Sequence, residues 1–344
     1  MKNGQVKKLL LLLLVLPVVV LLSASVGSAN LSVAGSLRLL LSKMPYFGKW
    51  VDISDQKEVY QTILFQVRLP RILLAALVGA GLSLTGAVFQ GMFRNPLADP
   101  HILGVSSGAA VGATFAILSG IRLSFFGLGA VGICAFLGAL LTIFLVYQIA
   151  CIREQMSSVT LLLTGTAVST MLSACVSFLM SIHQEGIEKV YMWTLGSFSS
   201  ASWTKAGYLA VCLLICGAGL MALASDFNLL LTGEEAAQSM GVDLVRLRRR
   251  VIFFASLLVA SCVAVSGVIG FVGLIIPHCM RMIGGADYRS LIPFSLAGGA
   301  VFMVLCDMMA RTVTAPSEIP VGVVTSLIGA PYFIYLIYRN GRKG

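Results

Sequence analysis

Long stretches without any charged residue dominate this chain and restrict what it can fold into. The nine stretches are 9–37, 72–93, 100–121, 123–152, 155–184, 206–225, 251–280, 290–306 and 319–338. Only 11% of the residues are charged, whereas a soluble domain carries about 25%. The bilayer is therefore the expected solvent. Because backbone groups in lipid must pair internally, and because these stretches do not alternate as barrel strands do, the spans are expected to be helices.

The number of spans depends on how the stretch 251–280 is interpreted. As one helix it would place Arg281, Arg289 and the basic C-terminus outside the cell. A turn at Gly267–Gly273, followed by a short helix through Pro277, places them inside. The positive-inside rule favours this second arrangement, with 14 basic residues inside and 10 outside. The sequence thus predicts an all-α protein of about ten transmembrane helices, one membrane domain over 1–344, with both termini cytoplasmic.

The first stretch and the net charge each allow a second interpretation. Lys7, Lys8 and the following apolar residues resemble a secretory signal, but the stretch is long enough to span and more spans follow. A retained first helix is expected. The net charge of +10 is attributed to the positive-inside rule and to anionic lipid headgroups, and no nucleic acid partner is expected. The eight cysteines show no CxxC pair and are interpreted as buried packing residues.

A charged segment, 226–250, lies between two apolar runs and contains eight charged residues. Thr232 and the pair Glu234–Glu235 favour a helix start, because carboxylates stabilise the positive end of a helix. Gly241 suits the position just after a helix. A second helix is predicted from Asp243 into the next span. Two helices joined at a glycine would form a rigid projection in the aqueous phase, although composition alone also allows an ordinary solvated loop.

Polar residues at the ends of the spans have competing interpretations. In the sequence QVRLPRILLA, Pro70 suits the first turn of an inward-running helix, which places Arg68 and Arg71 at its outer end. These arginines could contact lipid headgroups or an acidic partner, and the residues alone do not decide. Asp307 is the ionisable residue that stands out within the spans, and Arg311 follows it at the spacing of a helical ion pair.

Other sequence features concern packing and chemistry. Asp99 is predicted to cap a helix that begins at Pro100, and two prolines in 94–100 make a tight connection, either a plain loop or a constriction of a pathway. Small residues spaced four apart favour close helix packing, namely Gly79 with Ser83, and Gly104 with Gly108 and Gly112. There is no GxxxxGK[ST] motif, no carboxylate cluster around the three histidines, and no convergent catalytic set. No catalytic residue, metal site or cofactor of the chain itself is therefore expected.

Five blocks, in order over about 60–340, resemble the permease subunits of type II ABC importers, the FecCD/BtuC-like family that takes up ferric siderophores, haem and cobalamin. The blocks are RLPR at 68–71, GAVFQGMFRNPLADPHILGVSSGAAVGA at 86–113, GEEAAQSMGV at 233–242, SGVIGFVGLIIPH at 266–278 and DMMARTVTAPSEIPVGVVTSLIGAPYFIYLI at 307–337. The resemblance implies ten helices in a multi-pass protein of the bacterial cell membrane. It also implies a second permease subunit, identical or similar, two separate ATPase subunits that use ATP and magnesium, and an extracytoplasmic substrate-binding protein.

The resemblance assigns roles to individual residues. ATPase coupling is implied for Gly233, Glu234, Glu235, Ala236, Ala237 and Gly241. Docking of the binding protein is implied for Arg68, Arg71 and Arg311, although Arg311 could also serve Asp307 alone. An inner gate is implied at Asn95, Leu97 and, by a looser match, Ser158. The expected function is uptake of a metal chelate by alternating access. The alternatives are a self-contained secondary transporter or channel, which would need more buried ionisable groups, and a membrane-embedded enzyme.

Overall fold

The chain folds into a bundle of long antiparallel helices. The computed structural model describes residues 3–27, 32–43, 58–125, 127–150 and 158–341. Within these residues the helices of the bundle are α1 Asn3–Ser25, α4 Leu69–Met92, α5 Val105–Ser119, α6 Ala130–Ala150, α7 Ser158–Ile182, α9 Trp203–Ala222, α12 Leu244–Ser266, α13 Val272–Gly284, α14 Tyr288–Thr312 and α15 Val321–Gly341. Seven helical segments in the described part are long and apolar enough to cross a membrane, and α5, α13 and the described part of α15 are shorter apolar helices. The predicted all-α fold with ten membrane helices is confirmed.

Short elements join the bundle helices at its two ends. They are α2 Val33–Ser42, α3 Glu58–Thr62, the π-helical turn η1 Ile63–Arg68, the 3-10 turns η2 Pro100–Leu103 and η3 Gln184–Gly186, α8 Ile187–Thr194, α10 Ala224–Leu230 and α11 Glu234–Ser239. A small antiparallel hairpin of β1 Ser124–Phe125 and β2 Leu128–Gly129 precedes α6, with Ser124 opposite Gly129 and Phe125 opposite Leu128.

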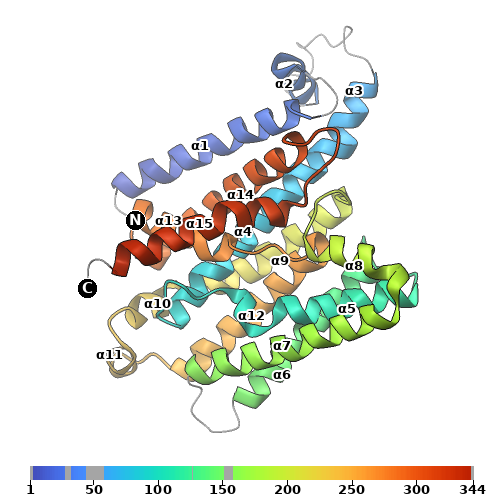
Figure 1. Cartoon of the computed structure of the whole chain (residues 1–344). Coiled ribbons are helices and arrows are strands. Elements are labelled where there is room, and N and C mark those ends of the chain that lie inside the picture. Colours follow the sequence, from blue (N-terminus) through green and yellow to red (C-terminus); the bar gives the residue numbers. More distant parts are fainter. Residues whose placement is uncertain (1–2, 28–31, 44–57, 126, 151–157, 342–344) are drawn as a thin grey trace.

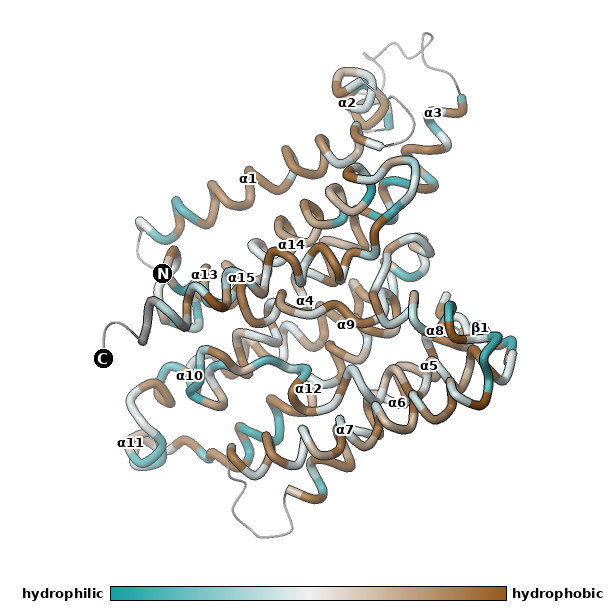
Figure 2. The backbone as a smooth tube through the Cα atoms, in the orientation of Figure 1, coloured by the Kyte–Doolittle hydropathy of each residue, from teal (hydrophilic) through white to brown (hydrophobic). Residues whose placement is uncertain are grey.

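The bundle has two distinct ends. The start of α1, the end of α15 and the segments α10 and α11 lie at one end, which we call the α11 end (Figure 1). The segments α2, α3, α8 and the hairpin lie at the opposite end, which we call the arginine end after Arg68, Arg71 and Arg311. Hydrophilic residues gather at these ends, whereas the middles of the helices are mostly hydrophobic (Figure 2). This distribution is the one expected for helices surrounded by hydrocarbon at mid-length and by water at their ends.

The stretch 251–280 turns back as predicted. Helix α12 ends at Ser266, and α13 begins at Val272. Gly267 has a φ of 72°, and a Cβ atom there would collide with the carbonyl oxygen of Trp193. Only glycine therefore fits both the backbone angle and the available space at this turn.

Three predicted helix boundaries were wrong. The first stretch is broken after Ser25, because Gly27 has a positive φ and the Ser32 side chain caps the separate helix α2 by accepting a hydrogen bond from the amide of Gly35. Pro70 lies in the first turn of α4 as predicted, but this is not where the helix starts, since the chain is helical from Glu58 onward. The π-helical turn η1 just before Pro70 widens the helix where the proline ring would otherwise meet a preceding carbonyl.

The third wrong boundary lies after Asp99. The Asp99 side chain does accept a hydrogen bond from the amide of His101, but the element that it caps is only the 3-10 turn η2. Gly104 follows with a φ of 80° in the left-handed region, so that α5 begins at Val105. Asp99 therefore caps the short turn η2, and Gly104 separates this turn from α5.

Small residues produce the closest helix contacts, as predicted. On α4 and α14, Gly79 and Gly299 face each other so closely that a Cβ atom on either would meet the other's carbonyl oxygen. On α5 and α6, Gly108 and Gly138 approach in the same way. In lipid the hydrophobic effect does not drive helices together, so the van der Waals energy of such close backbone contacts holds them in place.

We expect Gly79→Leu to disrupt the α4–α14 contact, because the neighbouring backbone cannot move aside. Overpacking of this kind costs about 1–3 kcal/mol or more. The measurement is the temperature at which half of the detergent-solubilised protein loses its monodisperse elution peak. Gly207→Leu on α9 is the matched control, because no atom lies within 4 Å of the position of a Cβ there. Equal midpoints for the two variants would contradict the close-contact role of Gly79.

Candidate functional site

The charged segment 226–250 forms a compact projection at the α11 end of the bundle (Figure 1). Helix α11 begins after Gly233, which has a φ of 123°, and ends before Gly241, which has a φ of 92°. Gly241 thus occupies the predicted position after the helix. Asp243 caps α12 by accepting a hydrogen bond from the amide of Arg246. The predicted helix start is confirmed, with Glu234 and Glu235 in the first turn of α11 and Gly233 as the residue that precedes it.

Contacts inside the projection hold α11 against the start of α12. The Glu234 carboxylate forms an ion pair with Arg248, with 2.7 Å between Oε1 and Nη2. Ala237 is completely buried. The amide of Val242 donates a hydrogen bond to the carbonyl oxygen of Ala237. A force applied to α11 therefore reaches α12 through an ion pair and through the backbone.

A second set of contacts, not predicted from the sequence, links the projection to α4 and α14. On α10, the Asn228 side chain donates to the Asp287 carboxylate at 2.7 Å and accepts from the amide of Tyr288 at 2.8 Å. The Phe227 and Tyr288 rings stack with their centroids 4.8 Å apart. The Tyr288 hydroxyl donates to the carbonyl oxygen of Ala87 on α4. The proximity of Asn228 and Asp287, 59 residues apart in the chain, leaves no signal in a single sequence.

The Asp287 carboxylate is held in its charged form at this junction. Partial burial tends to raise its pKa, but hydrogen bonds from Asn228 and from the backbone amide of Arg289, together with the nearby Arg289 charge, lower the pKa below its usual value. The charged carboxylate caps α14 at the positive end of the helix dipole. The contact between α10 and α14 therefore persists at neutral pH.

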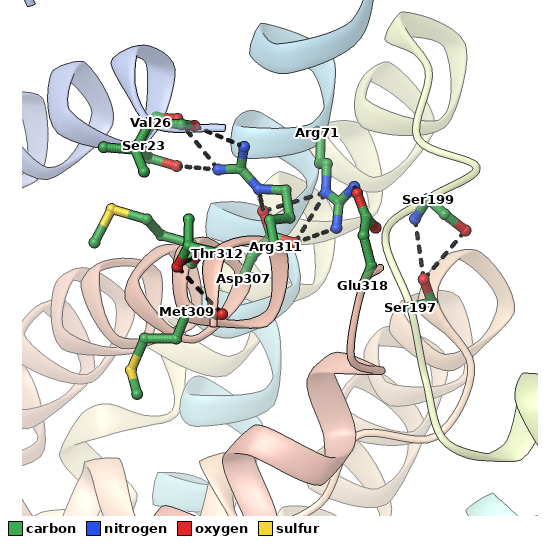
Figure 3. A network of polar contacts seen from close by, with 11 residues as sticks. Ser23, Val26, Arg71, Ser197, Ser199, Asp307, Met309, Arg311, Thr312 and Glu318 are labelled. Carbon is green, nitrogen blue, oxygen red and sulfur yellow. Dashed lines mark hydrogen bonds and ion pairs between the residues drawn. The ribbon is translucent and has the colours of Figure 1, made fainter. Parts of the chain in front are cut away.

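A buried network of charges occupies the arginine end. Asp307 is fully buried and binds two guanidinium groups, Arg71 at 2.9 Å and Arg311 at 3.0 Å (Figure 3). This confirms the predicted ion pair between Asp307 and Arg311. Arg71 also binds both oxygens of Glu318, at 3.0 and 2.9 Å. The four side chains come from α4, α14 and the loop after α14, so the network joins three segments that are distant in the sequence.

Two of the arginines also hold the end of α1. Arg311 donates to the carbonyl oxygen and the hydroxyl of Ser23, and to the carbonyl oxygen of Val26. Arg68 donates to the carbonyl oxygens of Ala24 and Ser25. The last carbonyls of a helix lack intrahelical partners and carry partial negative charge, which is why cations stabilise them.

The structure thus places the predicted docking residues Arg68, Arg71 and Arg311 together, but turned inward. Their exposed fractions are 5%, 9% and 8%. Each of them bonds to groups of the chain itself. Their role in docking stays a prediction.

The predicted gate residues lie on segments that approach each other. Asn95 and Leu97 lie in the turn after α4, where the Asn95 side chain accepts a hydrogen bond from the amide of Leu97 at 2.9 Å. Further along the same connection, η2 packs closely against α7, where a Cβ atom on Gly165 would meet the carbonyl oxygen of Ile102. Ser158 is the first residue of α7, and its side chain lies outside the described residues. The gating role stays a prediction.

In the part of the chain that the structure describes, no three His, Cys, Asp or Glu side chains are grouped as metal ligands. Cysteines in the described segments are free thiols and belong to the helices of the bundle. The predicted burial holds for Cys216, Cys262 and Cys306, but it was wrong for Cys175, which is exposed, and the other three are half-buried. Cys151 lies outside the described residues.

A family model described as the FecCD transport family matches residues 12–339. The chain belongs to the FecCD transport family. Proteins similar to the chain include the molybdate import system permease MolB of Haemophilus influenzae, 41% identical over 96% of this chain and 94% of MolB. The hemin transport system permease HmuU of Yersinia pestis is 37% identical over 98% of each chain. The cobalamin import system permease BtuC of Halobacterium salinarum is 44% identical over 81% of this chain and 74% of its own length.

A solved structure agrees with this assignment. It is titled an inward-facing conformation of a putative metal-chelate type ABC transporter, and it matches the chain with a TM-score of 0.82 and 39% identity over 97% of this chain and 99% of that one. This FecCD family chain is therefore a multi-pass membrane permease of an ABC transporter, with the fold of its relatives.

Proposed function

We propose that this chain is the permease subunit of an ATP-driven importer that carries a metal-containing compound, such as a metal chelate, into the cytoplasm by alternating access. Relatives that cover almost the whole chain are named as permeases for molybdate and hemin, and another for cobalamin. In this proposal two separate ATPase subunits bind at the α11 end, and a second permease subunit, identical or similar, completes the pathway. A substrate-binding protein docks at the arginine end.

The observation that carries the proposal is the rigid connection between α11 and the rest of the bundle. Glu234 ties α11 to α12, and Asn228 ties α10 to the start of α14. A displacement of this projection by an ATPase would therefore be transmitted to two bundle helices at once. Both described chain ends lie on the same side as the projection, in keeping with cytoplasmic termini.

The buried charges at the arginine end argue against a self-contained proton-coupled carrier. Asp307 is the buried carboxylate that such a carrier would use, but it is bound by both Arg71 and Arg311. Both of its carboxylate oxygens accept hydrogen bonds from guanidinium groups, so releasing one of them to carry a proton would break a buried ion pair.

Uptake into proteoliposomes tests the proposal. The permease is reconstituted alone and together with its ATPase subunits and binding protein, and uptake of labelled molybdate, hemin and cyanocobalamin is followed with and without ATP. We expect saturable uptake of one of these compounds only in the complete system with ATP. Saturable uptake by the permease alone would establish a self-contained carrier and contradict the proposal.

A further inference from the structure

A cavity of about 820 Å³ opens at the arginine end of the bundle, between α8, the segment after it, and the ends of α6, α9 and α12. Small-molecule sites in proteins generally have volumes of about 300–1,000 Å³. The cavity lies at the end where a binding protein would deliver its compound in the proposed function, so its chemistry bears on what the permease accepts.

Three cations line this cavity: Arg122, Lys189 and Lys205. Among the described residues of its wall, Glu318 is the only carboxylate, and Arg71 already binds both of its oxygens. In Figure 3 Glu318 lies between Arg71 and the turn that carries Ser197 and Ser199. The wall therefore has an excess of positive charge that its own carboxylate does not neutralise.

Lys205 shows this imbalance most clearly. Its ammonium group is partly buried and donates to the carbonyl oxygen and the hydroxyl of Ser200, at 2.9 and 2.7 Å. Within the described part of the chain, no carboxylate lies within 4 Å of it, nor of the charged groups of Arg122 and Lys189. Lys205 is partly removed from water without a counter-charge, and Arg122 and Lys189 are exposed beside it and add to the positive potential, so this wall is complementary to an anion.

Hydroxyl groups complete the wall beside these cations. Ser197, Ser199 and Ser200 lie in the loop between α8 and α9. The Ser197 hydroxyl accepts a hydrogen bond from the amide of Ser199 and donates to the Ser199 hydroxyl, whose own hydrogen can donate to another acceptor. Cations with neighbouring hydroxyl donors are the groups that bind oxyanions and carboxylates in proteins.

We infer that this cavity binds a small anionic ligand, either an oxyanion or an anionic metal chelate, as the first contact of the transported compound with the permease. This inference rests on the proposed function for the identity of the ligand as substrate. It favours an anionic compound over a neutral one, because only an anion is attracted by the positive potential of the three cations.

Direct binding without ATP or partner subunits tests the inference. The full chain is placed in nanodiscs of zwitterionic lipid, which offers no anionic headgroup, and equilibrium dialysis is performed with labelled molybdate, an anionic ferric tris-catecholate and neutral cyanocobalamin. We expect saturable binding of at least one anionic probe, and binding weaker by about tenfold or more in Lys189→Gln/Lys205→Gln. Lys189→Arg/Lys205→Arg should restore binding by keeping the charge.

Lys8→Gln is the matched control, because Lys8 is an exposed lysine at the opposite end of the bundle. It should leave binding of the anionic probe unchanged. The inference is overturned if neither anionic probe binds, if the glutamine variant binds as well as the unaltered chain, or if cyanocobalamin binds as tightly as the anions. It is also overturned if the glutamine variant loses only affinity for the binding protein. Anion binding without ATP-driven uptake would contradict the proposed function alone.

Discussion

Asp307→Ala should cause the largest loss of stability of any single substitution considered for this chain. It removes the carboxylate that binds Arg71 and Arg311, and both guanidinium groups are almost completely buried. Breaking a buried ion pair by removing one partner costs about 3–5 kcal/mol, because an uncompensated charge remains inside the protein. The measurement is thermal unfolding in detergent, followed by the loss of the monodisperse elution peak.

Glu318→Gln serves as the control for this prediction, because Glu318 binds Arg71 as well but has a side chain that is 43% exposed. We expect a much smaller shift, since water can solvate the group that remains. A triple variant with Arg71, Asp307 and Arg311 replaced by apolar residues should recover part of the stability lost in Asp307→Ala. Equal midpoints for Asp307→Ala and Glu318→Gln would show that the buried carboxylate does not hold the network together.

The combination Glu234→Arg with Gly241→Pro should abolish most ATP-driven uptake while leaving the bundle folded. Proline requires a φ near −65°, whereas Gly241 has a φ of 92° and an amide that donates to the carbonyl oxygen of Gln238. The new arginine would face Arg248 in place of the present ion pair. Both changes disturb the projection at its two attachments to α12, so we expect uptake to fall by about tenfold or more.

Uptake and ATP hydrolysis are measured in the same proteoliposomes, because loss of coupling should reduce uptake more than hydrolysis. Ser239→Ala is the matched control on α11, since it removes only a hydroxyl group bonded to the carbonyl oxygen of Ala236. An unchanged elution profile establishes that the double variant folds. Normal uptake by a correctly folded double variant would rule out the coupling role of this projection.

Local patterns in the sequence account for much of the fold. Charge-free stretches mark the helices because hydrocarbon excludes charged side chains whatever the neighbouring helices are. The turn at Gly267 and the helix end at Gly241 follow from backbone angles that glycine adopts most easily. The pair of Asp307 and Arg311 follows from a spacing of four residues on one helix.

The predictions made from local sequence patterns were wrong where the backbone is irregular. Pro70 is a good helix-start signal, yet the π-helical turn before it allows the helix to continue from Glu58. The stretch from Leu9 carries no charge throughout, yet its helix breaks after Ser25 near a glycine with positive φ. The composition of a stretch shows how apolar it is, but it does not show whether the backbone stays helical throughout the stretch.

The sequence by itself determined the membrane helices, the position of the projection and the family of this permease, because these depend on the hydrophobicity, spacing and order of residues along the chain. Only the tertiary structure decided that Arg71 binds Glu318, that Arg68 and Arg311 hold the end of α1, and that Asn228 meets Asp287. The same is true of the cations that surround one cavity. Such contacts join residues far apart in the chain, and they form only because the packing of small residues brings particular helices side by side.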